Sequence, residues 1–364
     1  MIGFFPELYP DELLYSAFSR YYDMSGYCSD ASAKADLFEN PRLTIDPFLC
    51  NPLTKSAKQI LLHERTTARI LENHTMLPLY IRFAGKLVKQ KISGSHEGIF
   101  IPGYDSKYRV LCYCSACAIE DRNRYGETYW HRCHQIAETP ICERHYCRLI
   151  QYKVDRRRLI SAEQAIGESP ISSLPVRDQQ EIGVARYVKS VFMADLHLED
   201  SASVKPFLTA RLQQTPYASA SGHINAEMLR RDIINRFRIP SVETWEFKDV
   251  FDIENPDFFK TCLLGLFLKI SPQELCYPGY MERPERIRLP RIETSKRGTK
   301  PIDWDAADEQ FYPRVEAAIR EIRNGACNRA QITKGTVERY LGLKPKTISQ
   351  MPKCRALVEK EQEK

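Results

Sequence analysis

Hydrophobic residues recur at helical spacing along most of the chain. After Pro10 and Asp11, the positions Leu13, Leu14 and Phe18 fall on one side of a helix and predict that a helix begins near the amino terminus. Similar spacing predicts helices in residues 57–63, 67–71, 179–192, 225–237, 256–268 and 315–322. There is no internal repeat, no heptad pattern and no convincing run of alternating strand positions. The pattern therefore predicts a mainly α fold, with small β pieces only.

Six of the 12 cysteines lie within residues 112–147, which changes this picture. Cys114-Ser-Ala-Cys117 and Cys142-Glu-Arg-His145 are two short pairs in which both side chains can face one ion. Two such pairs supply four ligands and close a tetrahedral shell, which is typical of structural rather than catalytic Zn²⁺. The alternative is coincidental packing of a cysteine-rich stretch. Three further cysteines lie close enough to compete as ligands, and their roles stay open: Cys112, Cys133 and Cys147.

A second metal pattern lies between the two pairs. His131-Arg-Cys-His134, followed by Glu138, has metal-ligand spacing but lacks the glutamate of HExxH that would act as a general base. We expect residues 129–137 to form a short helix. We favour the interpretation that its histidines lie on the surface or just outside the metal shell and do not bind the ion. One of them would hydrogen-bond a zinc-bound sulfur.

Positive charge gathers near the carboxyl end of this +6 chain. Residues 283–300 hold seven basic and two acidic residues, interrupted by prolines and a glycine, so an extended basic linker is expected over 283–301. Such a segment suits phosphate contacts, although a merely solvated linker fits equally well. The candidate nucleic-acid contacts of the linker are Arg286, Arg288, Arg291, Lys296 and Arg297.

Residues 332–351 follow the pattern of a helix-turn-helix. Thr333 can cap a first helix that buries Val337 and Leu341, Gly342 can make the turn, and Pro345 suits the first turn of a second helix. A purely structural helical pair is the alternative. Polar side chains that would face nucleic acid are Lys334, Lys344, Lys346, Thr347, Ser349, Gln350, Lys353 and Arg355.

Several classes of protein are disfavoured by the sequence. There is no signal-peptide pattern and no apolar run near the ~20 residues of a membrane span, so a reducing cytoplasm is expected. No GxxxxGK[ST] or GxGxxG motif supports a nucleotide-dependent enzyme, and the acidic residues are scattered. We therefore expect that this protein is not an enzyme. A zinc hydrolase or nuclease is the weakest alternative.

Three stretches resemble the TniQ/TnsD family of transposition target-selection proteins: PELYPDELLYSAFSRYY, HTMLPLYIRF and, above all, CSAC…RYGETYWHRCHQIAETPICERH. The resemblance is strong over about the first 150 residues and thinner beyond, where residues 302–304 look like the TnsD carboxyl-terminal part. This chain is shorter than full TnsD proteins and lacks the second zinc pair of some TniQ members. By resemblance, Cys114, Cys117, Cys142 and His145 bind the zinc.

The resemblance implies a bacterial, nucleoid-associated adaptor with no catalytic residues. A TnsD-type member binds attachment-site DNA and recruits an AAA+ ATPase and the transposase. A TniQ-type member instead bridges an RNA-guided CRISPR surveillance complex, with its guide RNA, to that ATPase. The expected organisation is a TniQ-like helical domain (1–107), a zinc-finger module (108–152), a helical middle domain (153–282), the basic linker (283–301) and a helix-turn-helix region (302–364).

Overall fold

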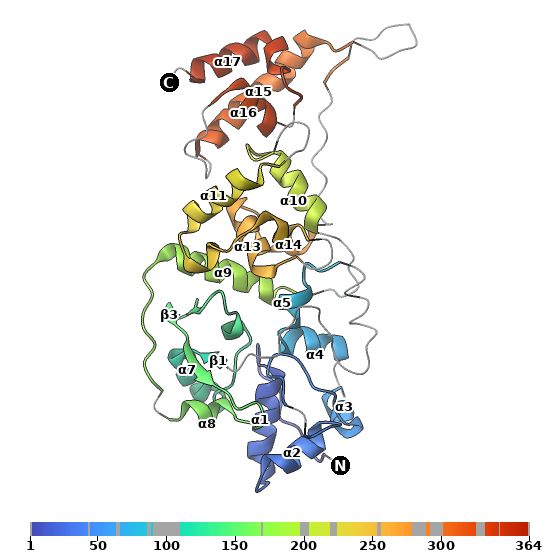
Figure 1. Cartoon of the computed structure of the whole chain (residues 1–364), viewed down its shortest axis with the longest axis vertical. Coiled ribbons are helices and arrows are strands. Elements are labelled where there is room, and N and C mark those ends of the chain that lie inside the picture. The colour runs from blue at the N-terminus through green and yellow to red at the C-terminus, as the bar shows by residue number, and fades with distance from the viewer. Residues whose placement is uncertain are drawn as a thin grey trace. The chain divides into compact units, whose positions relative to one another are not determined.

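A computed structural model describes residues 2–42, 44–62, 66–85, 89, 110–168, 170–196, 204–218, 224–252, 256–278, 289–291, 301–324, 332–341 and 343–362. These residues form two compact units, one of residues 1–203 with 252–263 and one of residues 204–251 with 264–364 (Figure 1). Both units are mainly helical, as the periodicity predicted, with small strand pairs in the first.

The first unit holds its helices around the cysteine-rich block. Its elements are α1 (Leu14–Ser25), α2 (Asp30–Leu37), α3 (Lys55–Leu61), α4 (Thr67–His74), α5 (Leu77–Ile81), β1 (Val110–Tyr113), α7 (Ser115–Tyr125), η1 (Cys133–Gln135), β2 (Ile141–Cys142), β3 (Cys147–Arg148), β4 (Ile150–Lys153), α8 (Ala162–Ile166) and α9 (Gln179–Met193). The bounds of α9 differ by only one residue from the predicted helix 179–192.

Helix α1 packs against the segment that joins the two cysteine pairs. Leu13, Leu14, Ala17 and Phe18 are almost completely buried, as their spacing predicted. The Leu13 N–H donates to the carbonyl of Trp130 at 2.9 Å, and the Trp130 N–H donates to Ser16 Oγ at 3.1 Å. Trp130 is itself fully buried. The amino-terminal helix and the cysteine-rich block therefore share one core.

Two antiparallel strand pairs frame the cysteine-rich block. β1 pairs with β4, with Tyr113 opposite Ile150, and β2 pairs with β3, with Cys142 opposite Cys147. Helix α7 follows β1 directly and ends at Gly126, whose left-handed φ of 83° is a conformation that favours glycine. The segment 129–137, predicted to be helical, contains only the single 3-10 turn η1, because extended residues around it pair with the chain near Asp11.

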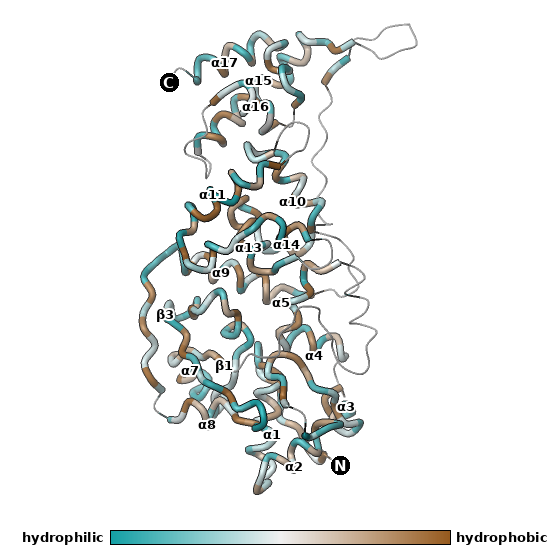
Figure 2. Tube along the Cα trace, viewed as in Figure 1, coloured by the Kyte–Doolittle hydropathy of each residue, from teal (hydrophilic) through white to brown (hydrophobic). Residues whose placement is uncertain are grey.

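The second unit contains α10 (Val204–Gln213), α11 (Ala226–Phe237), η2 (Pro240–Val242), α12 (Phe247–Val250), α14 (Pro272–Cys276), α15 (Trp304–Asn324), α16 (Lys334–Tyr340), η4 (Ile348–Gln350) and α17 (Pro352–Gln362). Helix α13 (Phe258–Phe267) contributes its residues up to Leu263 to the first unit and the rest to the second. Figure 2 shows hydrophobic and hydrophilic stretches mixed along most helices, as amphipathic packing requires.

Helices α15, α16 and α17 share a core built around Phe311, Val315, Val337, Ile348 and Val358. This cluster is apolar throughout, so its burial supplies the main stabilisation of the three helices. Two buried carboxylates, on α15 and α16, accept backbone N–H groups at the turns between the helices. Within the described ranges, no helix has the length and apolar character needed to cross a bilayer.

The carboxyl-terminal helical pair differs from the predicted helix-turn-helix. Thr333 caps α16 through its hydroxyl, which accepts the N–H of Thr336 at 3.1 Å, as predicted. Pro345 does not begin a helix. Glu338 is buried and accepts the N–H groups of Lys346 (3.1 Å) and Ile348 (2.9 Å), which holds a turn and the 3-10 helix η4 before α17 begins at Pro352. Gly342, the predicted turn residue, lies outside the described residues.

Candidate metal centre and basic surfaces

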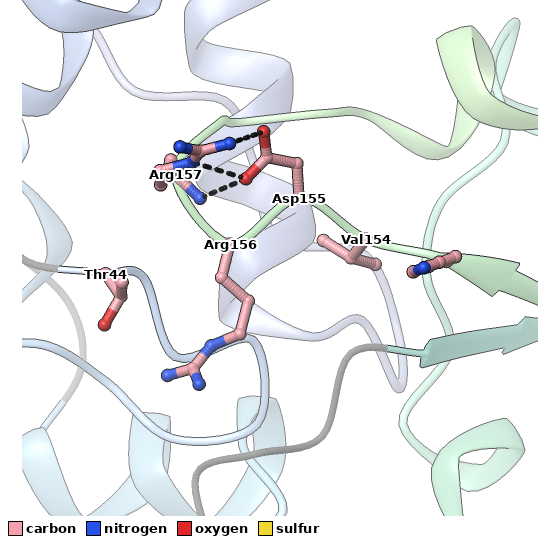
Figure 3. Close-up of a pocket in the computed structure, with 6 residues that line it drawn as sticks. Thr44, Val154, Asp155, Arg156 and Arg157 are labelled. Carbon is pink, nitrogen blue, oxygen red and sulfur yellow. Dashed lines mark hydrogen bonds and ion pairs between the residues drawn. The ribbon is translucent and has the colours of Figure 1, made fainter.

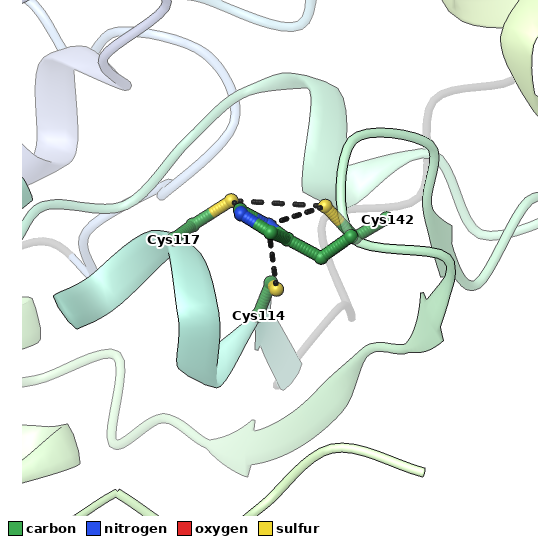
Figure 4. Close-up of side chains that lie close together, drawn as sticks. Cys114, Cys117 and Cys142 are labelled. Carbon is green, nitrogen blue, oxygen red and sulfur yellow. Dashed lines mark hydrogen bonds between the residues drawn. The ribbon is translucent and has the colours of Figure 1, made fainter. Parts of the chain in front are cut away.

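The four predicted zinc ligands come together in the first unit. Cys114 ends the loop after β1, Cys117 lies in the first turn of α7, and Cys142 and His145 belong to the β2–β3 hairpin. Their ligand atoms all lie within 4.8 Å of one another. Figure 4 shows the three cysteine sulfurs turned toward a common centre. The hairpin and the helix start therefore act as the two knuckles that the spacing predicted.

The distances fit a tetrahedral ion. Nδ1 of His145 lies 3.5 Å from Sγ of Cys114, 3.3 Å from Sγ of Cys117 and 3.5 Å from Sγ of Cys142. The sulfurs of Cys117 and Cys142 are 3.7 Å apart. With Zn–S and Zn–N bonds of about 2.3 and 2.05 Å, the edges of a tetrahedral shell are roughly 3.6–3.8 Å. The group can therefore hold a metal ion, and its donor set suits Zn²⁺.

The outer nitrogen of His145 is held by a residue that sequence reasoning missed. Nε2 of His145 lies 2.8 Å from Oε1 of Glu120 on α7. Glu120 is three residues after Cys117, so the helical repeat could have placed it on the ligand side. Burial lowers the pKa of His145, but the bond to Glu120 and the adjacent thiols outweigh burial and raise that pKa to about 9. A metal ion would displace this proton from Nδ1.

Two neighbours of the cluster lie outside the group of four. Sγ of Cys147 is 3.4 Å from Sγ of Cys114, which is too long for a disulfide and close enough for an S–H···S contact. His134 is buried, and its Nε2 lies 3.8 Å from Sγ of Cys117. Burial lowers the pKa of His134 to about 3, so the ring is neutral. This is the histidine contact to a cluster sulfur that we expected; neither His131 nor His134 is on the surface.

A polar network joins residues 6–22, here called the amino-terminal motif, to the cysteine-rich block. Arg20 is buried, contacts Glu12 at 3.1 Å and Glu127 at 2.8 Å, and stacks 3.9 Å above the ring of Tyr9. Arg132 binds the Asp11 carboxylate at 3.1 Å. Buried and half-buried ion pairs thus connect the amino-terminal motif to the cysteine-rich block.

The predicted nucleic-acid residues differ in their surroundings. Arg286, Arg288, Lys296 and Arg297 lie outside the described residues. Arg291 is exposed and forms an antiparallel β-bridge with Ile302. Lys334 and Lys353 make ion pairs with Glu359 and Glu309 within the helical bundle. Exposed side chains of the set are those of Lys344, Lys346, Gln350 and Arg355, and Ser349 is half-buried.

Thr347 differs from the prediction. Its side chain is buried, and its hydroxyl donates to the carbonyl of Lys344 at 2.6 Å. The cause is the 3-10 turn η4, which points this position inward where a helix from Pro345 would have exposed it.

A basic pocket of about 450 Å³ lies beside β4 in the first unit (Figure 3). Thr44 and residues 153–157 line it. Its acidic residue, Asp155, pairs with Arg157 at 3.2 Å, and Arg156 donates to the carbonyl of Ile45. The carboxylate of Asp155 therefore offsets part of the positive charge that the pocket offers to an anion.

Comparison with known proteins gives a family match for the first part of the chain. Residues 3–149, which contain the amino-terminal motif and the whole Cys114–His145 block, match the TniQ family. The chain is similar to the TniQ family over this region, as the motifs indicated.

A more distant similarity extends beyond it. The chain is 25% identical over 279 residues to the transposon Tn7 transposition protein TnsD of Escherichia coli. That alignment covers 71% of this chain and 53% of TnsD, so the chain spans about half the length of that relative.

Proposed function

We propose that the protein is a non-catalytic target-site selector of a heteromeric bacterial transposon. It binds attachment-site DNA and recruits an AAA+ ATPase regulator, which engages the transposase. The observation that carries this proposal is the TniQ match over residues 3–149, which includes all four residues of the Cys114–His145 cluster. The similarity to a transposition protein supports the same role.

The cluster supports a structural rather than a catalytic role for the ion. Four protein ligands leave no position for a water or a substrate, which a catalytic zinc needs. Bound Zn²⁺ would fix α7 and the β2–β3 hairpin relative to each other. Because Trp130 and the Asp11–Arg132 pair lie on the same core, this would also stiffen the surface of α1. Such a rigid surface suits the recruitment of a protein partner.

The second unit would carry the DNA contacts. Lys344, Lys346 and Gln350 are exposed around η4, and Arg355 is exposed on α17. Lysine and arginine suit phosphates, and glutamine suits base edges. Residues 283–301, which come shortly before α15 in the sequence, add further positive charge.

DNA binding by the full chain tests the DNA-binding half of the proposal. Affinity for a fragment carrying the attachment site should fall steeply with salt, because each neutralised phosphate releases counterions. Replacing both Lys344 and Lys346 by Gln should weaken binding and flatten the salt dependence by roughly two ions. Lys55→Gln, an equal change of charge per site at an exposed residue of the first unit, serves as the control.

The outcomes separate two kinds of adaptor. Site-specific binding without RNA, lost in the double variant, supports direct reading of DNA. Retention of the protein by a guide RNA–effector complex, with no DNA binding of its own, would favour the bridging role. The AAA+ ATPase of the same transposon should be captured by the protein in the presence of target DNA or of the guide RNA–effector complex. Failure to capture it with either would contradict the proposal.

A further inference from the structure

A second group of potential metal ligands lies beside the Cys114–His145 cluster and shares no residue with it. Asp11 from the amino-terminal motif and His131 and Cys133 from the segment between the knuckles place one ligand atom each within 4.8 Å of one another. His131 is buried, whereas Asp11 and Cys133 are half-buried. We propose that these three residues form a second site for a divalent transition-metal ion such as Zn²⁺.

The backbone holds the three residues in place without help from an ion. Glu12 and His131 form an antiparallel bridge, and the N–H of Arg132 donates to the carbonyl of Asp11 at 2.8 Å. The N–H of Cys133 donates to Oδ2 of Asp11 at 3.1 Å. Asp11 has a left-handed φ of 58°, a conformation that aspartate adopts more readily than most residues with a Cβ. The site is therefore preorganised by two segments far apart in the sequence.

The orientation of His131 is that of a metal ligand. Its Nε2 lies 2.9 Å from Oδ2 of Asp121, so the hydrogen between them belongs on Nε2. A carboxylate behind a histidine in this manner fixes the tautomer of many metal-bound imidazoles. Nδ1 is the ring nitrogen that faces Oδ2 of Asp11, at 3.9 Å. This distance is too long for a hydrogen bond, and a cation between the two atoms would bind both.

The donor types and the surrounding charges agree with an ion of this class. One imidazole, one thiolate and one carboxylate are ligands of Zn²⁺, and three protein ligands leave a further position for water. Of the nearby cations, Arg132 pairs with Oδ1 of Asp11 at 3.1 Å and also donates to the carbonyls of Glu72 and Thr75, and Lys189 pairs with Glu143 at 2.7 Å. The oxygen of Asp11 that faces His131 is Oδ2, which Arg132 does not bind.

A buried histidine beside the group also supports a cation at this site. The ring of His134 lies 4.8 Å from that of His131, between centroids, and its Nδ1 is a buried atom with no hydrogen-bond partner among the described residues. A buried unpaired acceptor costs free energy. A hydrated cation in its neighbourhood would reduce that cost.

Counting metal ions in the full-length protein tests the proposal. Protein loaded with Zn²⁺ and freed of loosely bound metal should contain two ions per chain by mass spectrometry. Cys133→Ser and Asp11→Asn should each reduce the content to one, Cys142→Ser should also leave one, and the Cys133/Cys142 double substitution should leave none. Cys50→Ser is the matched control and should keep two, since Cys50 lies outside both groups.

Cobalt binding to the wild-type protein decides the matter if a variant does not fold. Co²⁺ should saturate at two equivalents, with a thiolate-to-cobalt absorption about three times stronger for the ion bound by three sulfurs than for the ion bound by Cys133 alone. Saturation at one equivalent, or two zinc ions retained in a folded Cys133→Ser variant, would overturn the second site. Either result leaves the role of the Cys114–His145 cluster and the proposed function untouched.

Discussion

Glu120 and His145 are joined by a 2.8 Å hydrogen bond that leaves Nδ1 of the histidine facing three cysteine sulfurs. Glu120 is on α7 and His145 is in the β2–β3 hairpin, so the bond ties the two knuckles together outside the metal-binding shell. Partners of this kind set the direction and the basicity of a ligating imidazole.

We predict that Glu120→Ala weakens zinc binding at the Cys114–His145 cluster by 10–100-fold, the range typical for loss of such a partner. The reason is that His145 loses its fixed orientation. Competition with a chromogenic chelator measures the change. Glu227→Ala, at an exposed position of α11, is the control, and an affinity equal to that of the control would show that Glu120 does not support the ligand.

Cys147 and Cys114 should behave differently although their sulfurs are 3.4 Å apart. Cys114→Ser removes a ligand of the group of four, so the cluster should lose its ion to a chelator far faster than in the wild type. Cys147→Ser removes only a neighbour and should keep the ion with at most a few-fold faster release. If the two variants release zinc equally fast, Cys147 is itself a ligand and His145 is displaced.

The clustering of Cys114, Cys117, Cys142 and His145 could be predicted from sequence because each pair of residues is local. Two residues between ligands place both side chains on one turn, whatever surrounds it. The helices at 179–192 and 225–237 could be predicted for a similar reason, since periodicity within one segment determines which face it buries.

Contacts between distant segments could not be predicted in this way. Glu338 reaches from α16 to the backbone of Ile348 and replaces an expected helix by η4. The chain near Asp11 pairs with residues 131–132 and keeps that segment extended. A buried carboxylate decides the local structure in the first case, and a bridge between remote residues decides it in the second. Neither contact can be recognised from the sequence of one segment.

The buried Arg20–Glu12 pair should be strongly coupled. Arg20→Met would leave the fully buried Glu12 without its cation and should destabilise the first unit by about 3–5 kcal/mol. Adding Glu12→Gln should restore part of that loss, because the uncompensated charge is removed. Denaturant unfolding of the four members of the cycle measures the coupling. Arg157→Met, in the exposed pair with Asp155, should change stability by less than ~0.5 kcal/mol, and strictly additive effects of Arg20 and Glu12 would refute the coupling.

Asp308 on α15 should support the start of α17 in a pH-dependent manner. Its buried carboxylate accepts the N–H groups of Lys353 at 2.7 Å and Cys354 at 2.9 Å, so it acts as a cap supplied from another helix. Asp308→Ala should destabilise the bundle of α15, α16 and α17 by about 1–2 kcal/mol. Burial raises the pKa of Asp308, but these backbone donors outweigh burial and lower it below its ordinary value of 3.8.

The sign of the pH effect follows from that shift. Because the folded state holds this carboxylate in its charged form, the charge-dependent stabilisation is complete above pH ~4 and declines as the pH falls through the lowered folded-state pKa. The difference in unfolding free energy between wild type and Asp308→Asn should therefore be constant from pH 7 to about pH 5 and shrink below pH ~4. Glu316→Gln, at an exposed pair with Arg320, should show no such trend. A difference that stays constant down to pH 2 would show that the carboxylate's charge does not stabilise α17.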